Sequence, residues 1–317
     1  MDLLILETGL GERDVRAIAA TAPIRYKTYE IEKRNGGKRL ISQPARELKA
    51  LQRVIVNEVL DKLPVHPAAT AYRPSLSIKD NAKPHTVSGA ILKLDFKDFF
   101  PSLREVDWES YCKQHNIFET PEDIHLSSRI LFHRKKTAST LRLAIGAPSS
   151  PTLSNVLMFE LDTHISKLVA SDGITYTRYA DDMTFSAPRA WNLVGTLRKV
   201  RKLLRDTASP RLQLNTDKTV LVTKKYRRVV TGLVISDDQR VSLGHERKRL
   251  LRAAVYRFIQ GKLSIREQAR LAGNLAFAYS IEPEFIQRLE DRYGTSTITD
   301  IKRAPRLLQS SGDNQNR

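Results

Sequence analysis

Hydrophobic positions recur along the chain with two different periods, and their alternation predicts a mixed fold. A period of three to four residues predicts helices, whereas alternating or short continuous apolar runs predict strands. The predicted helices lie near Val15 and Ile18 and over residues 48–63, 151–169, 191–206 and 245–293. The predicted strands lie at residues 26–33, 38–41, 90–94, 174–178, 183–187, 219–223 and 229–235. Because no regular strand–helix–strand repeat joins them, the predicted fold class is α+β.

Turn signals and composition mark the boundaries of the segments. Residues 1–25 are expected to form an N-terminal helical segment that ends near Pro23. Asn35-Gly36-Gly37 lies between the first two strands and predicts a hairpin turn. Residues 295–317 are rich in small and polar side chains, and we expect them to form a flexible tail.

The charge balance suggests a polyanionic partner. The chain has 317 residues, and 53 lysines and arginines against 35 aspartates and glutamates give a net charge of +18 and a pI of about 10.0. A protein this basic commonly binds nucleic acid. The alternative is a surface charge that only keeps the protein in solution. The hydrophobic fraction of 41% excludes a disordered chain.

The sequence lacks the features of membrane-spanning, secreted and disulfide-bonded proteins. No run of 18 apolar residues is present, so we expect no membrane-spanning helix and no membrane partner. The acidic Asp2 and Glu7 stand where a signal peptide needs basic residues. Cys112 is the single cysteine, which excludes an internal disulfide and any multi-cysteine metal site. We therefore expect a cytoplasmic protein.

Three carboxylates are the most specific chemical signal. Tyr179-Ala180-Asp181-Asp182 lies between two predicted strands, and a hairpin turn there presents both carboxylates together. An upstream strand ends in Asp95. Adjacent carboxylates repel each other unless a cation binds, and oxygen ligands of this kind suit the two Mg²⁺ ions of a phosphoryl-transfer site. An ordinary polar turn is the alternative for Asp181-Asp182 alone.

The order of these carboxylates resembles the palm of a reverse transcriptase. The resemblance implies that Asp95 and Asp181 hold two Mg²⁺ ions, with Mn²⁺ as a substitute, and that Asp182 completes the site. Asp98 is expected to be peripheral. The resemblance also implies a right-hand polymerase fold, with interleaved fingers and palm over residues 26–238. In it, the palm combines an antiparallel sheet with helices, and residues 239–294 form a helical thumb.

The same resemblance implies contacts with the incoming deoxynucleoside triphosphate. Phe100 matches the aromatic residue under the sugar, although a core position is the alternative and Phe96 and Phe99 compete for the role. Gly146 matches the turn of the second palm motif, where this chain has Ile145 in place of the usual glutamine.

Three basic residues complete the implied nucleotide site. Lys218 lies in Leu214-Asn215-Thr216-Asp217-Lys218-Thr219, which resembles the element after the palm helix. There it would stabilise or protonate the leaving phosphates. Lys38 and Arg39 lie in the fingers hairpin and would bind the triphosphate. A solvated surface position is the alternative for all three.

Two short motifs narrow the resemblance to retron reverse transcriptases. Asn81-Ala82-Lys83-Pro84-His85 and Val230-Thr231-Gly232 resemble the two retron signatures, in the expected order around the palm. They make Asn81 and His85 candidates for RNA binding, and a buried structural histidine is the alternative for His85. On the thumb, the basic side chains expected to contact phosphates are Arg247, Lys248, Arg249 and Arg252.

The retron resemblance implies a specific reaction. The enzyme would bind a cognate structured noncoding RNA (msr-msd) and prime DNA synthesis from the 2′-hydroxyl of a guanosine, which gives a branched msDNA. It also implies antiphage defence with a separately encoded effector protein, and RNase H activity from the host. The alternatives are a reverse transcriptase of the diversity-generating or abortive-infection type, and a non-catalytic RNA-binding scaffold with a polymerase fold.

Overall fold

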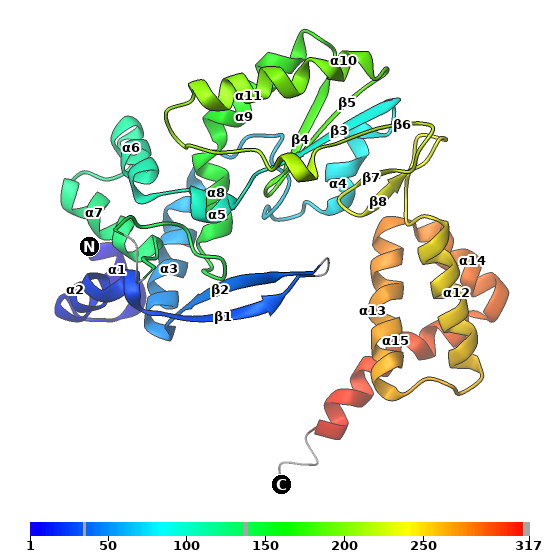
Figure 1. Cartoon of the computed structure of the whole chain (residues 1–317). Helices are drawn as coiled ribbons and strands as arrows, with labels where there is room; N and C mark the ends of the chain where they lie inside the picture. Colours follow the sequence, from blue (N-terminus) through cyan, green and yellow to red (C-terminus); the bar gives the residue numbers. More distant parts are fainter. Residues whose placement is uncertain (34–35, 136–138, 313–317) are drawn as a thin grey trace. The chain divides into compact units, whose positions relative to one another are not determined.

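The chain forms two compact units. The structure is a computed structural model of the chain, and it describes residues 1–33, 36–135 and 139–312, with backbone alone from residue 304 onward (Figure 1). Unit 1 consists of Met1–Ser77 and Ser88–Thr223, and unit 2 of Ile78–Val87 and Lys224–Arg317. The second segment of unit 2 begins at residue 224, fifteen residues before the thumb boundary expected at residue 239.

Unit 1 contains a two-stranded hairpin, a four-stranded sheet and most of the helices. The hairpin is β1 (Tyr26–Glu32) and β2 (Lys38–Pro44), and the sheet strands are β3 (Ala90–Asp95), β4 (Thr175–Tyr179), β5 (Asp182–Ala187) and β6 (Val220–Thr223). The α-helices are α1 (Asp2–Thr8), α2 (Glu12–Thr21), α3 (Arg46–Glu58), α5 (Phe99–Ser102), α6 (Glu105–His115), α7 (Pro121–Leu131), α8 (Ser150–Leu157), α9 (Phe159–Ala170), α10 (Trp191–Val194) and α11 (Thr196–Asp206). Short 3₁₀ helices are η1 (Ala22–Ile24), η2 (Leu60–Lys62) and η4 (Thr216–Lys218).

The four-stranded sheet is antiparallel, with strand order β4-β5-β3-β6. Strand β3 lies inside the sheet and is buried along its length except at Lys93, as its continuous apolar run predicts. Helix α9 packs against β4 and α11 packs against α9. The register pairs Asp95 with Asp182, so the end of β3 meets the start of β5.

Several predicted elements are interrupted in the structure, and three of them show where the interruption falls. The helix predicted over 151–169 divides at Met158 into α8 and α9, and that predicted over 191–206 divides at Gly195 into α10 and α11. The strand predicted over 229–235 is a hairpin, because Thr231 and Gly232 have φ values of 46° and 80° and reverse the chain.

Unit 2 combines a small sheet with helices. Its strands are β7 (Arg228–Val230), β8 (Leu233–Ile235) and β9 (Val241–Ser242), and its helices are α4 (Ile78–Ala82), η3 (Lys83–His85), α12 (His245–Ile259), α13 (Ile265–Ile281), α14 (Pro283–Tyr293) and α15 (Thr295–Gly312). Residues 295–312, expected to be flexible, instead form α15, and Ile298 and Ile301 are fully buried. Their three-residue spacing puts both on one helix face, which outweighs the polar composition. Residues 313–317 lie outside the described residues. None of the described helices is long and apolar enough to cross a membrane.

Candidate active site

The predicted carboxylate pair lies at a two-residue hairpin loop. Tyr179 and Asp182 are the closing pair of β4 and β5, so Ala180 and Asp181 form the loop. Ala180 has φ 58°, a left-handed conformation that is uncommon for a residue with a Cβ atom. The main-chain N–H of Phe96 donates to the carbonyl oxygen of Asp181 at 3.1 Å. This bond joins the loop to the end of β3.

Asp95 lies beside this loop and is only 4% exposed. The ammonium of Lys218 lies 2.9 Å from the carboxylate and donates to Oδ2. Oδ1 lies at the same distance from this ammonium, without the geometry of a hydrogen bond. The N–H of Asn215 donates to the main-chain oxygen of Asp95 at 2.7 Å, which brings the segment that carries Lys218 against the strand end.

The pKa shifts show an excess of negative charge at this point. Lost hydration, followed by the charge of Asp95, raises the pKa of Asp181, and the charges of Lys218 and Arg39 oppose the shift. Lost hydration, followed by the charge of Asp181 and contact with Asp95, raises the pKa of Asp182 to about 6. Burial lowers the pKa of Lys218, but its hydrogen bond to Asp95 and the surrounding carboxylates outweigh this and raise it. A bound cation would relieve this repulsion.

The chemistry of these donors fits a divalent metal ion. Carboxylate oxygens are hard ligands, and a buried Oδ1 of Asp95 that accepts no hydrogen bond is suited to a cation. Among the residues that the structure describes, however, no three histidine, cysteine, aspartate or glutamate side chains are arranged to hold an ion. The ammonium of Lys218 supplies positive charge at Asp95 in this arrangement.

A cavity of about 540 Å³ opens in front of the carboxylates. Six of the candidate site residues line it: Lys38, Arg39, Asp95, Phe100, Asp181 and Lys218. Asp98, which was expected to be peripheral, also lines it, as do Phe96, Phe99 and Ile145. Asp182 and Gly146 are not among the lining residues. The cavity therefore joins acidic groups that can hold cations with basic groups that can bind phosphates.

The aromatic residues after Asp95 all line the cavity but differ in burial. Phe96 and Phe99 are buried and stack with ring centroids 5.7 Å apart, whereas Phe100 is half-buried. The ring of Tyr72 lies 6.2 Å from that of Phe100. Tyr72 has φ 60° and is 45% exposed. The sequence analysis missed Tyr72, because a tyrosine in a loop has no periodicity or spacing that marks it.

The β1–β2 hairpin carries two of the cavity's basic residues. Lys38 pairs with Glu30 at 2.7 Å, which ties it to the opposite strand, and Arg39 lies in the cavity wall. Asn35 and the neighbouring Arg34, in the predicted turn, lie outside the described residues. The N–H of Ser42 donates to the carbonyl of Ile145 at 2.8 Å. Because this bond uses main-chain atoms, the isoleucine in place of glutamine does not affect it.

Gly146 allows this hairpin to pack closely against the turn before α8. Its φ is 117°, and an added Cβ would lie 2.9 Å from Cγ2 of Ile41 and 3.1 Å from the carbonyl oxygen of Ser42. A side chain at this position would push the two segments apart. Gly146 thus fixes the place of a cavity wall and does not line it.

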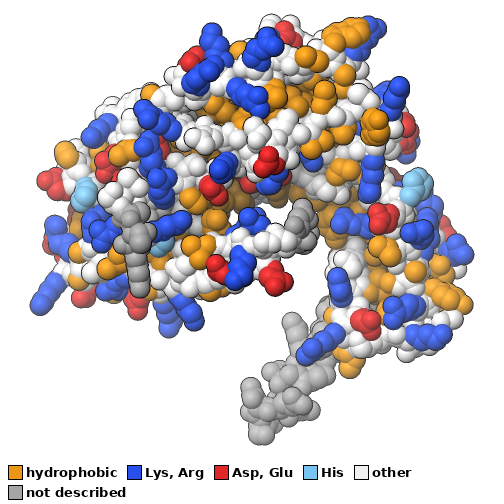
Figure 2. Space-filling view, in the orientation of Figure 1, with side chains coloured by type: hydrophobic (Ala, Val, Ile, Leu, Met, Phe, Trp, Pro, Cys, Tyr) orange, Lys and Arg blue, Asp and Glu red, His pale blue; other side chains and the backbone are white. Residues whose placement is uncertain are grey.

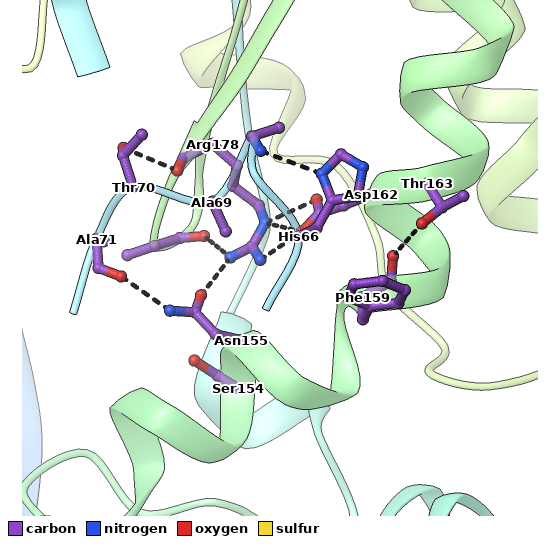
Figure 3. A network of polar contacts seen from close by, with 12 residues as sticks. His66, Ala69, Thr70, Ala71, Ser154, Asn155, Phe159, Asp162, Thr163 and Arg178 are labelled. Carbon is purple, nitrogen blue, oxygen red and sulfur yellow. Dashed lines mark hydrogen bonds and ion pairs between the residues drawn. The ribbon is translucent and has the colours of Figure 1, made fainter. Parts of the chain in front are cut away.

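A buried arginine supports the hairpin loop (Figure 3). Arg178 of β4 is fully buried and makes a bidentate ion pair with Asp162 of α9, with Nη2 2.6 Å from Oδ2 and Nε 2.9 Å from Oδ1. Its Nη1 donates to the carbonyl oxygen of Ala180 at 3.0 Å and to Oδ1 of Asn155 at 3.3 Å. The hydroxyl of Tyr176 donates to Asp162 at 2.7 Å. The guanidinium therefore joins α8 and α9 to the loop that carries Asp181.

Comparison with known proteins decides the family. The family described as Reverse transcriptase (RNA-dependent DNA polymerase) matches residues 31–246. The chain belongs to the reverse transcriptase family. It is 39% identical over 280 residues to the retron Ec83 reverse transcriptase of Escherichia coli, covering 88% of this chain and 90% of that protein. It is 35% identical over 305 residues to the retron Ec86 reverse transcriptase of the same organism, covering 93% and 91%.

These matches confirm the predicted family, fold class and enzyme class. The chain is an RNA-directed DNA polymerase with the α+β fold of a reverse transcriptase, and it groups with the retron reverse transcriptases. Reverse transcriptases use divalent metal ions, in agreement with the donor chemistry at Asp95 and Asp181.

The two retron-like motifs meet in unit 2 of this reverse transcriptase. The hydroxyl of Thr231 donates to the main-chain carbonyl of Ile78 at 3.0 Å, and α4 packs against β8. Asn81 and His85 are buried, with exposed fractions of 1% and 0%. Burial lowers the pKa of His85 to about 4, so the ring is neutral near pH 7. These side chains organise the motif from inside and offer no surface for direct RNA contact.

The basic residues predicted on the thumb helix differ in exposure, because Arg247, Arg249 and Arg252 are exposed and Lys248 is half-buried. Arg247 lies over the ring of Phe277 at 5.1 Å, and Arg252 lies over the ring of Phe285 at 5.4 Å. Lys248 pairs with Glu282 of the α13–α14 junction. Arg249 is exposed. Within unit 2, Arg249 and the stacked arginines are therefore the members of this group best placed to meet phosphates.

Proposed function

We propose that this enzyme copies a cognate structured noncoding RNA (msr-msd), and that it primes DNA synthesis from the 2′-hydroxyl of a guanosine in that RNA. The product would be a branched msDNA. The observation that carries this proposal is that one cavity is lined both by the carboxylates of Asp95 and Asp181 and by basic side chains that can bind phosphate. The proposal for the priming reaction draws on the likeness to the retron relatives and on the two motifs held together in unit 2.

The residues of the cavity take defined roles in this proposal. Asp95 and Asp181, with Asp182 beside them, would hold two Mg²⁺ ions, for which Mn²⁺ can substitute; when bound, these supply charge for the attacking and leaving oxygens. Lys38 and Arg39 attract the triphosphate of the deoxynucleotide. Lys218, with its raised pKa, stays protonated and can donate a proton or a hydrogen bond to the departing pyrophosphate.

Phe100 selects the sugar in this proposal. Its half-buried ring lines the cavity next to the ring of Tyr72 and is backed by the buried ring of Phe99, at 5.4 Å. A ring held in this way cannot easily move aside. It would collide with a 2′-hydroxyl on the incoming nucleotide, so deoxynucleotides are preferred.

Basic surfaces on each unit are suited to bind the RNA. In unit 1, a hollow of about 740 Å³ lies beside the end of α11 and is lined by Arg201, Arg205 and Arg211. In unit 2, a groove of about 340 Å³ is lined by Arg247, Arg257 and other residues of α12 and α13. Figure 2 shows that lysine and arginine side chains outnumber acidic ones on the face drawn. Such surfaces bind a phosphate backbone without reading its sequence.

The biological setting follows from the same proposal. A branched RNA–DNA product in the cytoplasm would serve antiphage defence together with a separately encoded effector protein. The RNA template strand would be removed by RNase H of the host. No membrane partner is part of this proposal.

The test uses nucleic acid that copurifies with the protein expressed from its native locus. We expect DNA that shifts in a denaturing gel after treatment with a 2′–5′ debranching enzyme. Asp181→Asn combined with Asp182→Asn should abolish this DNA and leave bound RNA. The matched control is Asp61→Asn, an exposed aspartate in η2 that does not line the cavity, and it should behave as wild type. DNA from the double variant would refute the catalytic assignment, and unbranched DNA would refute the priming reaction.

A second test addresses the RNA-binding surface of unit 1. Arg201→Gln, Arg205→Gln and Arg211→Gln together should weaken binding of poly(rA)–oligo(dT) and reduce the slope of log Kd against log salt by about 2, because each lost phosphate contact removes about 0.7–0.9. The control variant combines Arg53→Gln, Lys113→Gln and Lys167→Gln, which removes three charges from scattered exposed positions. It should leave the slope unchanged. Equal slopes for the two triple variants would show that only net charge matters.

A further inference from the structure

A buried side chain, that of Arg178, contacts the loop that carries Asp181 from the protein interior. Arg178 lies in β4, and Ala180 is the first residue of the loop that follows this strand. Nη1 of Arg178 reaches past the intervening residue and donates to the carbonyl of Ala180 at 3.0 Å. That carbonyl belongs to the peptide unit that precedes Asp181. Its orientation therefore helps to set the direction of the Asp181 side chain.

The guanidinium itself has little freedom to move. Nε and Nη2 bind the carboxylate of Asp162 in a fork, and Nη1 also donates to Oδ1 of Asn155, at 3.3 Å. Asn155 in turn donates to the carbonyl of Ala71 at 2.8 Å (Figure 3). Arg178, Asp162 and Asn155 are each at most 1% exposed. Because its partners on α8 and α9 hold the planar guanidinium in place, its hydrogen bond to the Ala180 carbonyl has a defined geometry.

The main chain of Arg178 is fastened as well. Its N–H donates to the carbonyl of Ala68 at 2.7 Å, and its carbonyl accepts from the N–H of Thr70 at 2.9 Å. These bonds fix β4 up to residue 178. Beyond that residue, the left-handed Ala180 turns the chain toward Asp181. The hydrogen bond from Nη1 to the Ala180 carbonyl therefore lies where β4 ends and the strained loop begins.

The charge of Arg178 is balanced by its ion pair. Asp162 neutralises the guanidinium at 2.6 Å, inside the protein. The leading cations that lower the pKa of Asp181 are Lys218 and Arg39, which line the cavity. The contact of Arg178 with the loop is therefore of interest for its geometry.

We propose that Arg178 is a positioning residue for DNA synthesis: anchored by Asp162 and Asn155, it fixes the Ala180–Asp181 peptide and so holds the Asp181 carboxylate in register with Asp95. This inference rests on the proposed role of Asp181 as a metal ligand. Misplacement of a reacting group by about 1 Å can cost about a hundredfold in rate. Loss of the anchor should thus lower kcat and weaken metal binding, with little change in KM for the template–primer.

The experiment compares two variants of the same buried cluster. Arg178→Lys keeps the positive charge for Asp162 but lacks the planar fork that also reaches Ala180. Tyr176→Phe removes a hydrogen bond to Asp162 and leaves the bond to Ala180 intact. Both should lower the thermal midpoint. On poly(rA)–oligo(dT) with dTTP, we expect kcat to fall at least tenfold for Arg178→Lys and to stay within twofold for Tyr176→Phe.

Two further measurements keep the inference open to refutation. If Arg178→Lys does not fold, Arg178→Met combined with Asp162→Leu removes both buried charges together and should fold while losing kcat. Binding of Mn²⁺ alone, followed by electron paramagnetic resonance, should weaken in the Arg178 variants and not in Tyr176→Phe. A folded Arg178 variant with kcat within twofold of wild type overturns the inference. Asp181→Asn is measured in parallel, because an active Asp181→Asn would instead refute the proposed metal site.

Discussion

Acidification should selectively destabilise the part of unit 2 that contains His85. The ring is fully buried, and burial lowers its pKa from 6.5 to about 4. The unfolded chain therefore binds a proton more tightly than the folded chain does. The stability that neutral His85 gives is complete above pH 6.5 and is lost as the pH falls toward 4. The pKa difference is worth about 3 kcal/mol in full, and about 2 kcal/mol of this is lost by pH 5.

The assay compares wild type with His85→Gln, which cannot take up a proton and still forms hydrogen bonds. Urea unfolding followed by far-UV circular dichroism reports the helices of unit 2 together with those of unit 1. Tryptophan fluorescence reports unit 1 alone, because Trp108 and Trp191 both lie there. Between pH 7 and pH 5 we expect wild type to lose about 2 kcal/mol more than His85→Gln in the dichroism signal. The control His245→Gln, an exposed histidine of the same unit, should follow wild type. Parallel pH profiles for wild type and His85→Gln would refute the reasoning.

Three other substitutions should separate stability from catalysis. Gly146→Ala should lower the free energy of unfolding by about 1–3 kcal/mol and raise KM for dTTP, because its Cβ would strike Ile41 and its φ is 117°; an unchanged tryptophan-monitored transition would contradict this. In metal-free buffer, Asp182→Asn should be more stable than wild type at pH 7 and no more stable below pH 4, because the raised pKa of Asp182, about 6, makes its ionised form unfavourable. Lys218→Met should lower kcat about a hundredfold with little change in thermal midpoint, since Lys218 is 59% exposed although it pairs with Asp95; a large fall in midpoint with kcat retained would make Lys218 structural.

Local patterns predicted the strands that carry the carboxylates. The apolar run before Asp95 and the two runs around residues 179–182 have few structural alternatives, since short apolar runs of this kind are typical of buried strands, although β4 lies at an edge of the sheet. The pairing of Asp95 with Asp182 follows once these strands are adjacent and antiparallel. The sequence therefore located the acidic cluster to within a residue.

Contacts made far apart in sequence were not predictable in this way. Helices α6 and α7 were missed, because their apolar positions are mixed with polar side chains that the fold buries, such as Ser127 hydrogen-bonded to Trp108. The cavity role of Tyr72 depends on a loop conformation with φ 60°. The α15 segment was expected to be flexible, because its burial depends on helix α13, against which it packs. In each case a tertiary partner decides the outcome, and no local pattern encodes it.

The contrast between Asp162 and Asp95 shows why residue type alone cannot assign a function. Both are nearly or fully buried aspartates that face a basic side chain. Asp162 accepts hydrogen bonds from Arg178 and Tyr176, so its charge is satisfied within the fold. Asp95 pairs with the largely exposed ammonium of Lys218, which donates a hydrogen bond to Oδ2 and also lies 2.9 Å from Oδ1. Unsatisfied charge costs stability, and a fold keeps it where a ligand will satisfy it. In the proposed mechanism, the fully paired Asp162 therefore supports the site and Asp95 belongs to it, and Arg178 connects Asp162 to the loop that carries Asp181.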